Sequence, residues 1–223
     1  MLIAGFQKLS MVDYPQKMCA VVFTPYCNFN CTYCHNYHIL GKDSPLIEEN
    51  EVFEYLQKRK GMLQAVVVSG GEPTLQPNLE DFLRSLKNMG YLVKLDTNGT
   101  KPELLKKLIS EKLVDYIAMD IKASEGKYDE LTQVSCDMRA IRRSIFYLRN
   151  TGIAHEFRTT FAPQLNKEDI LELTDMIAGT EHYYLQQYRK RKDDDPEPHL
   201  PSYINETADA VRQKIGVCIV RGL

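Results

Sequence analysis

Short β-rich runs alternate with helical patterns along most of this chain. The expected strands cover residues 19–24, 65–69, 92–97, 116–121, 156–161 and 183–188. Several of these runs are apolar at consecutive positions, as is typical of parallel strands that helices cover. Between the runs, apolar residues recur with the helical period of 3.6 residues. The alternation predicts an α/β fold with a parallel sheet and right-handed crossovers.

The number of strand–helix units limits the architecture. A closed barrel of this kind needs eight units, so six units predict a partial (β/α)6 barrel with its site at the carboxyl ends of the strands. Residues suited to helix starts are Ser44-Pro45, Asn78, Asp137 and Asn166, and residues suited to helix ends are Gly90 and Gly152. The stretch 204–223 predicts a short helix followed by an edge strand at 217–220.

Length and composition are those of a globular protein. The 223 residues are 43% hydrophobic and 26% charged, with a net charge of −2, so no basic field favours nucleic acid or an anionic membrane. No apolar run approaches the ~18 residues of a membrane span, and the first residues lack the pattern of a signal peptide. We expect a cytoplasmic protein with one domain over 1–223, its core at about 17–188 and a C-terminal extension at 189–223, and neither nucleic-acid nor membrane partners.

Three of the six cysteines fall in one short loop after the first expected strand. Cys27, Cys31 and Cys34 have the spacing CxxxCxxC. Three thiolates so spaced can hold three corners of a cubane iron–sulfur cluster, whose usual complement is four cysteines. The fourth iron would then be open to a substrate or cofactor, by the logic that separates catalytic from structural zinc sites.

Alternatively, this loop binds a zinc ion, with His35 or another cysteine as the fourth ligand of the metal. Paired CxxC half-sites would suit zinc better, and the sequence has none elsewhere. We interpret Cys19, Cys136 and Cys218, which lie far apart, as small buried hydrophobic residues.

A second motif, Ser69-Gly70-Gly71-Glu72-Pro73, ends the second expected strand. Two glycines let the backbone approach a ligand closely, and backbone N–H groups there can meet a carboxylate.

With the cysteine motif, the aromatic Tyr33 before its last cysteine and the GGEP sequence, the chain resembles the radical S-adenosylmethionine (radical SAM) superfamily. The resemblance implies a 4Fe–4S cluster whose open iron chelates the amino and carboxylate groups of SAM. It also implies that an electron from the cluster cleaves the sulfonium C–S bond to give a 5′-deoxyadenosyl radical, while the protein supplies placement.

Further motifs narrow the resemblance. They are Val12-Asp13-Tyr14-Pro15, Cys34-His35-Asn36, Asp96-Thr97-Asn98-Gly99, Met119-Asp120-Ile121-Lys122, Phe157-Arg158-Thr159-Thr160 and Tyr184-Leu185-Gln186-Gln187-Tyr188. Together they are similar to the activating enzymes of glycyl-radical proteins, most of all to anaerobic ribonucleoside-triphosphate reductase activating proteins. The match runs from about Gly5 to Tyr188. Two departures are Pro25-Tyr26, where the family often has glycine, and Arg189-Lys190, where Arg-Pro is common.

The resemblance implies partners and a reaction. The radical would abstract a hydrogen atom from a backbone glycine of a glycyl-radical protein, the large subunit of an anaerobic ribonucleotide reductase. A flavodoxin- or ferredoxin-type protein would donate the electron. No cysteine-rich insert follows the first motif, so we expect a single cluster.

The resemblance also implies a set of SAM contacts: Tyr33, Gly70, Gly71, Glu72, Asn98, Lys122, Arg158 and Gln186. Lys122 and Arg158 are basic residues at strands, where burial without a partner is costly. The SAM carboxylate is one partner for them, and an acidic neighbour in a structural ion pair is the alternative. Gln186 could reach the ribose or the adenine.

The resemblance further suggests a monovalent cation bound by Asp96, Asp120, Thr97 and the carbonyl group of Met119, since oxygen ligands suit a hard ion. The alternative role for Asp96 is to cap the turn before Asn98-Gly99, a strong turn pair.

Two other functions are compatible with these motifs. One is radical chemistry on a small molecule such as a deazapurine precursor, although the short gap between Cys27 and Cys31 argues against it. The other is a passive electron-transfer or zinc module, for which GGEP and an open iron would have no purpose. The charged run 189–195 is either a solvated loop or a loop that contacts a partner.

Overall fold

The computed structural model describes residues 1–41 and 45–223. In this part of the chain, one curved sheet holds its strands in chain order. The strands are β1 (Gly5–Tyr14), β2 (Lys17–Thr24), β3 (Ala65–Gly70), β4 (Leu92–Thr97), β5 (Tyr116–Asp120), β6 (Ala154–Phe161), β7 (Tyr183–Gln187) and β8 (Ile219–Arg221). β1 is antiparallel to β2, and every later neighbour is parallel. The six predicted strands and the C-terminal edge strand are therefore confirmed, with small shifts at their ends.

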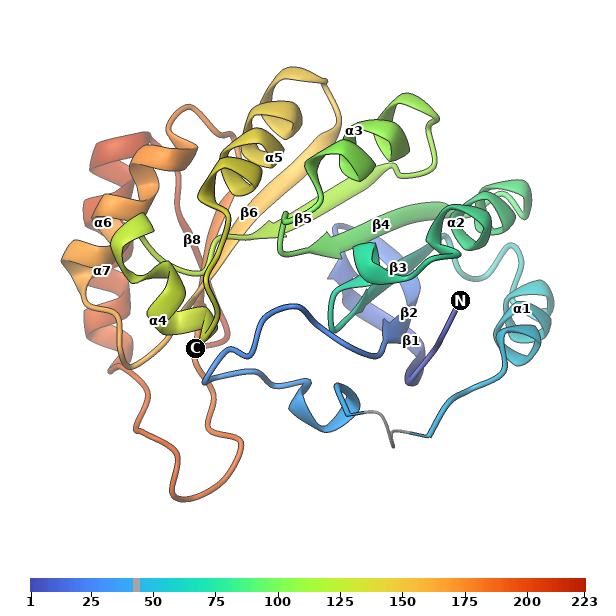
Figure 1. Cartoon of the computed structure of the whole chain (residues 1–223), viewed down its shortest axis with the longest axis horizontal. Helices are drawn as coiled ribbons and strands as arrows, with labels where there is room; N and C mark the ends of the chain where they lie inside the picture. The colour runs from blue at the N-terminus through green and yellow to red at the C-terminus, as the bar shows by residue number, and fades with distance from the viewer. Residues whose placement is uncertain (42–44) are drawn as a thin grey trace.

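Helices connect the parallel strands and lie along the outer side of the curved sheet (Figure 1). They are α1 (Glu49–Lys58), α2 (Leu79–Asn88), α3 (Pro102–Ser110), α4 (Tyr128–Thr132), α5 (Met138–Asn150), α6 (Lys167–Leu173) and α7 (Pro201–Ile215), with the short 3-10 turns η1 (Tyr37–Ile39), η2 (Pro73–Leu75), η3 (Glu125–Lys127) and η4 (Thr174–Ile177). This arrangement confirms the predicted α/β partial barrel.

Local chemistry explains several helix boundaries. The Asp137 side chain accepts hydrogen bonds from two N–H groups in the first turn of α5, and Asn166 forms a capping box with Asp169 at the start of α6. Asn78 precedes α2 without a side-chain cap. Ser44 lies outside the described residues, and α1 begins at Glu49, not at Pro45.

The antiparallel strand β1 was not predicted from the sequence. Its register against β2 shifts between Gln7 and Ser10 and again before Tyr14. Leu9, Met11 and Val12 are exposed, so β1 lacks the buried periodic pattern by which a strand is recognised. Irregular pairing of this kind is typical of an edge strand.

The two faces of the sheet have different chemistry. The main apolar core joins the outer face to the helices, and the buried apolar residues of α2 are Leu79, Phe82, Leu83 and Leu86. Residues two apart on a strand share a face, which brings Lys94 and Asp96 of β4 to the inner side with Glu156 and Arg158 of β6. The segment after β2 crosses this inner side (Figure 1). Within 1–41 and 45–223, no helix is long and apolar enough to cross a membrane.

Candidate functional site

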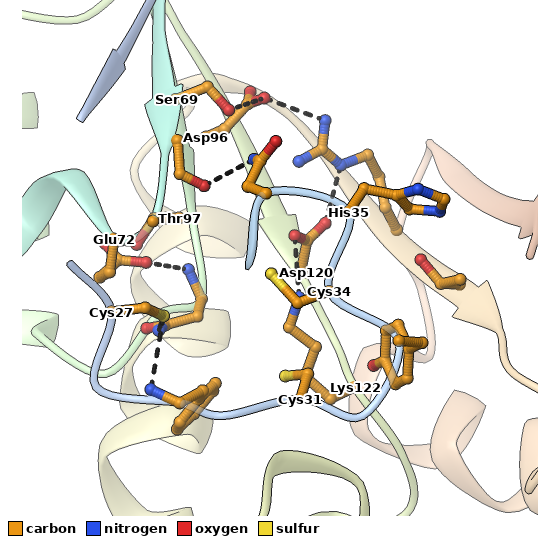
Figure 2. A pocket seen from close by; sticks show the side chains of 18 of the residues that line it. Cys27, Cys31, Cys34, His35, Ser69, Glu72, Asp96, Thr97, Asp120 and Lys122 are labelled. Atoms are coloured by element: carbon orange, nitrogen blue, oxygen red, sulfur yellow. Dashed lines mark hydrogen bonds and ion pairs between the residues drawn. The ribbon is translucent and has the colours of Figure 1, made fainter. Parts of the chain in front are cut away.

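A cavity of about 230 Å³ lies at the carboxyl ends of the strands. The loop after β2 forms one wall, and the ends of β3 to β7 form the other (Figure 2). The predicted site residues that line it are Cys27, Cys31, Tyr33, Cys34, Gly70, Gly71, Glu72, Asp96, Thr97, Asn98, Asp120, Lys122, Arg158 and Gln186. Met119 does not line it: this side chain is buried and packs against Gly99.

The cysteine loop is held by three neighbouring parts of the fold. The Asn30 N–H donates to the Thr132 carbonyl of α4 at 2.9 Å, and the Glu72 N–H donates to the Tyr26 carbonyl at 2.8 Å. The Asn36 side-chain amide donates to the carbonyl of Gly70 at 2.8 Å, and that of Asn98 donates to Asn28 at 2.9 Å. These bonds connect the cysteine loop to the GGEP motif, through Gly70 and Glu72, and to the Asp96-Thr97-Asn98-Gly99 motif, through Asn98.

The three cysteines present a donor set that fits an iron–sulfur cluster. All three line the same cavity. Burial raises the pKa of the Cys27 thiol to about 11, although the Phe29 N–H, 3.4 Å from its sulfur, favours the thiolate. Among the described residues, no three His, Cys, Asp or Glu side chains converge on one metal ion. Three thiolates on one loop can bind three irons of a cubane, each cysteine on a different iron.

The residue before the first cysteine adopts a left-handed conformation. Tyr26 has φ of 65°, a region that glycine enters without steric cost and tyrosine does not. A glycine at this position, which the family resemblance implies, would adopt the same conformation without strain.

The two glycines of the GGEP motif let the end of β3 pack against the end of β2 and against Tyr26, which follows β2. A Cβ on Gly70 would lie 2.3 Å from the Thr24 nitrogen, and a Cβ on Gly71 would lie 1.9 Å from the Tyr26 carbonyl oxygen. The N–H of Gly71 donates to the Thr24 carbonyl at 2.8 Å. The backbone of Gly70 and Gly71 thus packs against the backbone of residues 24–26. The N–H groups of Gly71 and Glu72 bond to carbonyls of that segment and do not face the cavity as free donors.

Glu72 joins the end of β3 to the end of β4. Its buried carboxylate accepts from the N–H and hydroxyl of Thr74 at 3.1 and 2.5 Å, from the Thr97 hydroxyl at 2.8 Å and from the Asn98 N–H at 2.7 Å. Burial raises the pKa of Glu72, and these donors oppose the rise. Three of these donors meet Oε1 and one meets Oε2; a carboxylate oxygen has about two acceptor sites, so Oε2 can accept a further donor.

An alternating chain of charges crosses the inner face of the sheet. The ion-pair distances are 3.2 Å for Lys94–Asp96, 3.3 Å for Asp96–Arg158, 2.9 Å for Arg158–Asp120 and 3.1 Å for Asp120–Lys122. Burial alone would raise the pKa of Asp120, but Arg158 and Lys122 lower it to about 2. The structural ion pairs considered for Lys122 and Arg158 are therefore present.

This chain of charges begins and ends with a lysine, and Lys122 and Arg158 also line the cavity. Each carboxylate oxygen of Asp96 and Asp120 lies near a side-chain cation. The Thr97 hydroxyl donates to Glu72. The monovalent cation at these residues stays a prediction.

Sequence reasoning missed several residues of this region. Ser69 and Thr160 belong to predicted motifs but had no assigned role, and His35 was considered only as a zinc ligand; all three line the cavity, and the Ser69 hydroxyl donates to Asp96 at 3.1 Å. Lys94 and Glu156 belong to the same network of ion pairs. A signal was available for these two, because each precedes a predicted site residue by two positions and so shares its face of the strand.

The charged loop after β7 is largely neutralised within itself. Lys190 pairs with Glu197 at 2.6 Å, Arg191 with Asp195 at 2.9 Å and Lys192 with Asp194 at 3.1 Å. The Arg191 guanidinium lies 5.4 Å from the centre of the Tyr37 ring, next to the cysteine loop. Contact with an acidic partner through these basic residues would have to compete with the pairs that the loop already forms.

We expect the buried carboxylate of Asp195 to fix this loop. Asp195 accepts from the backbone N–H and the guanidinium of Arg191, and these contacts lower its pKa. Asp195→Asn should speed hydrogen exchange of the Arg191 amide roughly tenfold or more, because it replaces the charged acceptor of that N–H with a neutral one. Asp194→Asn is the control, since its side chain is 74% exposed. Equal exchange in the two variants would contradict this role.

Sequence comparison identifies related proteins. The model of the radical SAM superfamily matches residues 21–177. A protein of Methanocaldococcus jannaschii, provisionally named a glycyl-radical enzyme activating enzyme, is 35% identical over 196 residues, which are 85% of this chain and 81% of that protein. A protein of Saccharolobus solfataricus, provisionally named GTP 3′,8-cyclase, is 32% identical over 133 residues, 57% of this chain and 42% of that protein.

Comparison of structures gives the same fold. SuiB of Streptococcus suis superposes with a TM-score of 0.72 at 16% identity, over 91% of this chain and 49% of SuiB. At this identity the likeness concerns the fold alone, and it agrees with the curved half-barrel sheet described above.

Proposed function

We propose a reaction for this chain from the fact that it belongs to the radical SAM superfamily, whose members use a 4Fe–4S cluster and SAM. The proposed reaction is abstraction of a hydrogen atom from a glycine of a partner protein. The observation that carries it is the convergence of Cys27, Cys31 and Cys34 with Lys122 and Arg158 on one cavity. The provisional name of the related M. jannaschii protein refers to such an activity, which supports the proposal.

The cluster and SAM supply the difficult chemistry when they are bound: one electron cleaves the sulfonium C–S bond to methionine and a 5′-deoxyadenosyl radical. Abstraction then converts a glycine Cα–H bond into a glycyl radical and yields 5′-deoxyadenosine. The glycyl radical is delocalised over the adjacent amide groups, whereas the attacking radical is a primary alkyl radical. The transfer therefore runs downhill and needs no acid–base residue.

The protein's part in this proposal is placement. Cys27, Cys31 and Cys34 would bind three irons of the cluster. Lys122 and Arg158 would face the carboxylate of SAM, since both line the cavity and belong to a chain of charges with a cation at each end. Glu72 would fix Asn98 and the end of β4 through the hydrogen bonds that it accepts from Thr97 and Asn98.

The partner in this proposal is a glycyl-radical protein, the large subunit of an anaerobic ribonucleotide reductase, with a flavodoxin- or ferredoxin-type electron donor. Support for this finer assignment comes from the ordered motifs between Gly5 and Tyr188. The S. solfataricus relative, whose name refers to a nucleotide substrate, makes radical chemistry on a small molecule the competing function.

The test is anaerobic incubation of the reconstituted, reduced protein with SAM. We expect release of 5′-deoxyadenosine, and we expect the EPR doublet of a glycyl radical when the reductase subunit is added. Failure to release 5′-deoxyadenosine would contradict SAM cleavage. A parallel incubation contains GTP instead of the reductase subunit. Release of 5′-deoxyadenosine without a glycyl radical, together with consumption of GTP, would favour the nucleotide reaction.

A further inference from the structure

We infer that Arg221, on the C-terminal strand β8, is a positioning residue for the cofactor pocket. It neutralises the buried carboxylate of Glu156 and so leaves Arg158 free to remain at the cavity. The inference rests on the proposed function, because it assumes that Arg158 contacts SAM. Arg221 itself does not line the cavity.

Arg221 and Glu156 form a two-pronged ion pair. The Arg221 Nη1 lies 3.0 Å from Oε1 of Glu156, and its Nη2 lies 3.3 Å from Oε2. The Tyr116 hydroxyl donates to the same Oε2 at 3.0 Å. The Glu156 side chain is fully buried. A carboxylate in this position needs a cation, since leaving a buried charge unpaired is strongly destabilising.

A second contact fixes the direction of the Arg221 side chain. Its guanidinium carbon lies 3.3 Å from the centre of the Tyr184 ring on β7. Arginine stacks on aromatic rings and binds carboxylates through two parallel N–H groups. The stack and the ion pair together direct the cation of β8 across β7 to β6.

Arg158 stands within reach of the same carboxylate. Its Nη1 is 4.0 Å from Oε1 of Glu156, but 3.3 Å from Asp96, while its Nε is 2.9 Å from Asp120. Glu156 and Arg158 share one face of β6 because they are two residues apart. In the part of the chain that the structure describes, the ion pairs of Glu156 are with Arg158 and Arg221.

Glu156 on one side and Asp96 and Asp120 on the other therefore compete for the guanidinium of Arg158. Without Arg221, the fully buried Glu156 side chain would have Arg158 as its nearest cation. Arg158 would then move towards Glu156 and away from Asp120 and the cavity. The role of Arg221 is therefore to satisfy Glu156, so that the guanidinium of Arg158 stays where a cofactor carboxylate can meet it.

The test measures SAM affinity of the reconstituted protein by calorimetry. Arg221→Gln should weaken SAM binding roughly tenfold to a hundredfold, the effect of losing a charge-assisted hydrogen bond from Arg158. Adding Glu156→Gln to Arg221→Gln should restore the affinity towards that of the parent, because it removes the carboxylate that attracts Arg158. A loss of packing around Arg221 would not be repaired in this way, so this rescue separates positioning from general damage.

Three further measurements complete the test. Arg158→Ala should itself weaken SAM binding; parent-like affinity would remove Arg158 from the pocket and overturn the inference with that part of the proposed function. If Arg158→Ala weakens binding and Arg221→Gln does not, or if the double variant binds as poorly as Arg221→Gln, the inference alone is wrong. A crystal structure of Arg221→Gln should show Arg158 hydrogen-bonded to Glu156. Should Arg221→Gln fail to fold, Arg221→Lys keeps a cation beside Glu156 and should retain most of the affinity; a loss equal to that of Arg158→Ala would contradict the inference.

Discussion

Replacing Cys31 by alanine should abolish both the visible absorbance of the iron–sulfur cluster and the reductive cleavage of SAM. Cys31 lies between Cys27 and Cys34 in the sequence of the loop that lines the cavity, and Lys122 lies beside it (Figure 2). Two remaining thiolates would hold a cubane at only two of its corners, one fewer than the open-iron arrangement requires. Iron and sulfide content, the absorbance spectrum and 5′-deoxyadenosine release measure the effect.

Cys136 provides a matched control for this experiment. It is partly buried, as Cys31 is, but it lies between α4 and α5 and does not line the cavity. Cys136→Ala should keep the cluster absorbance and SAM cleavage of the parent. Loss of the cluster in Cys136→Ala together with its retention in Cys31→Ala would show that the cysteine assignment is wrong.

The positions of the predicted strands follow from local sequence because burial on both faces leaves an unmistakable apolar run. Val66, Val67 and Val68 of β3 are all fully buried. A run of consecutive β-branched apolar residues is typical of a strand that is covered on both faces. The edge strand β1 is different. Its pairing with β2 is local but irregular in register, and contacts such as the bond from the Tyr55 hydroxyl to the Lys8 carbonyl come from residues far away in sequence.

The same distinction applies to the site. The cysteine spacing and GGEP are short-range patterns, and the structure places both at one cavity. The partners Asp96 and Asp120 of Arg158 could not be assigned from such patterns, because they come from two other strands, β4 and β5. Register across the sheet decides which of them meet. The role of Arg221 requires in addition that β8, whose Arg221 lies 65 residues after Glu156 in the chain, joins the same sheet.

The GGEP motif does belong to the site, as the sequence predicts, but approach of a ligand is only part of the reason for its glycines. A glycine beside a ligand pocket suggests close approach of the ligand. In this fold, the atoms closest to the missing Cβ of Gly71 belong to Tyr26, the residue that leads into the cysteine loop. The motif therefore sets the distance between β3 and that loop, and through it the shape of the cavity.

Replacing Gly71 by alanine should consequently be among the most destabilising single changes in this chain. The new Cβ would lie 1.9 Å from the Tyr26 carbonyl oxygen, which also accepts the Glu72 N–H at 2.8 Å. Neither group is a flexible side chain, so the backbone of the loop must move and that hydrogen bond must lengthen. We expect a loss of about 3 kcal/mol in the free energy of unfolding, the upper end of the usual range for overpacked sites, measured by urea denaturation of the apoprotein.

Gly126 offers the matched control. A Cβ at this exposed position of η3 would meet no atom within 4 Å, and its φ is not positive. Gly126→Ala should change the free energy of unfolding by less than about 1 kcal/mol, in the stabilising direction if alanine restricts the unfolded chain. Because the strain in Gly71→Ala falls on the cysteine loop, that variant should also take up less iron on reconstitution than Gly126→Ala. Equal stability and equal iron content in the two variants would mean that the approach of β3 to the loop does not shape the site.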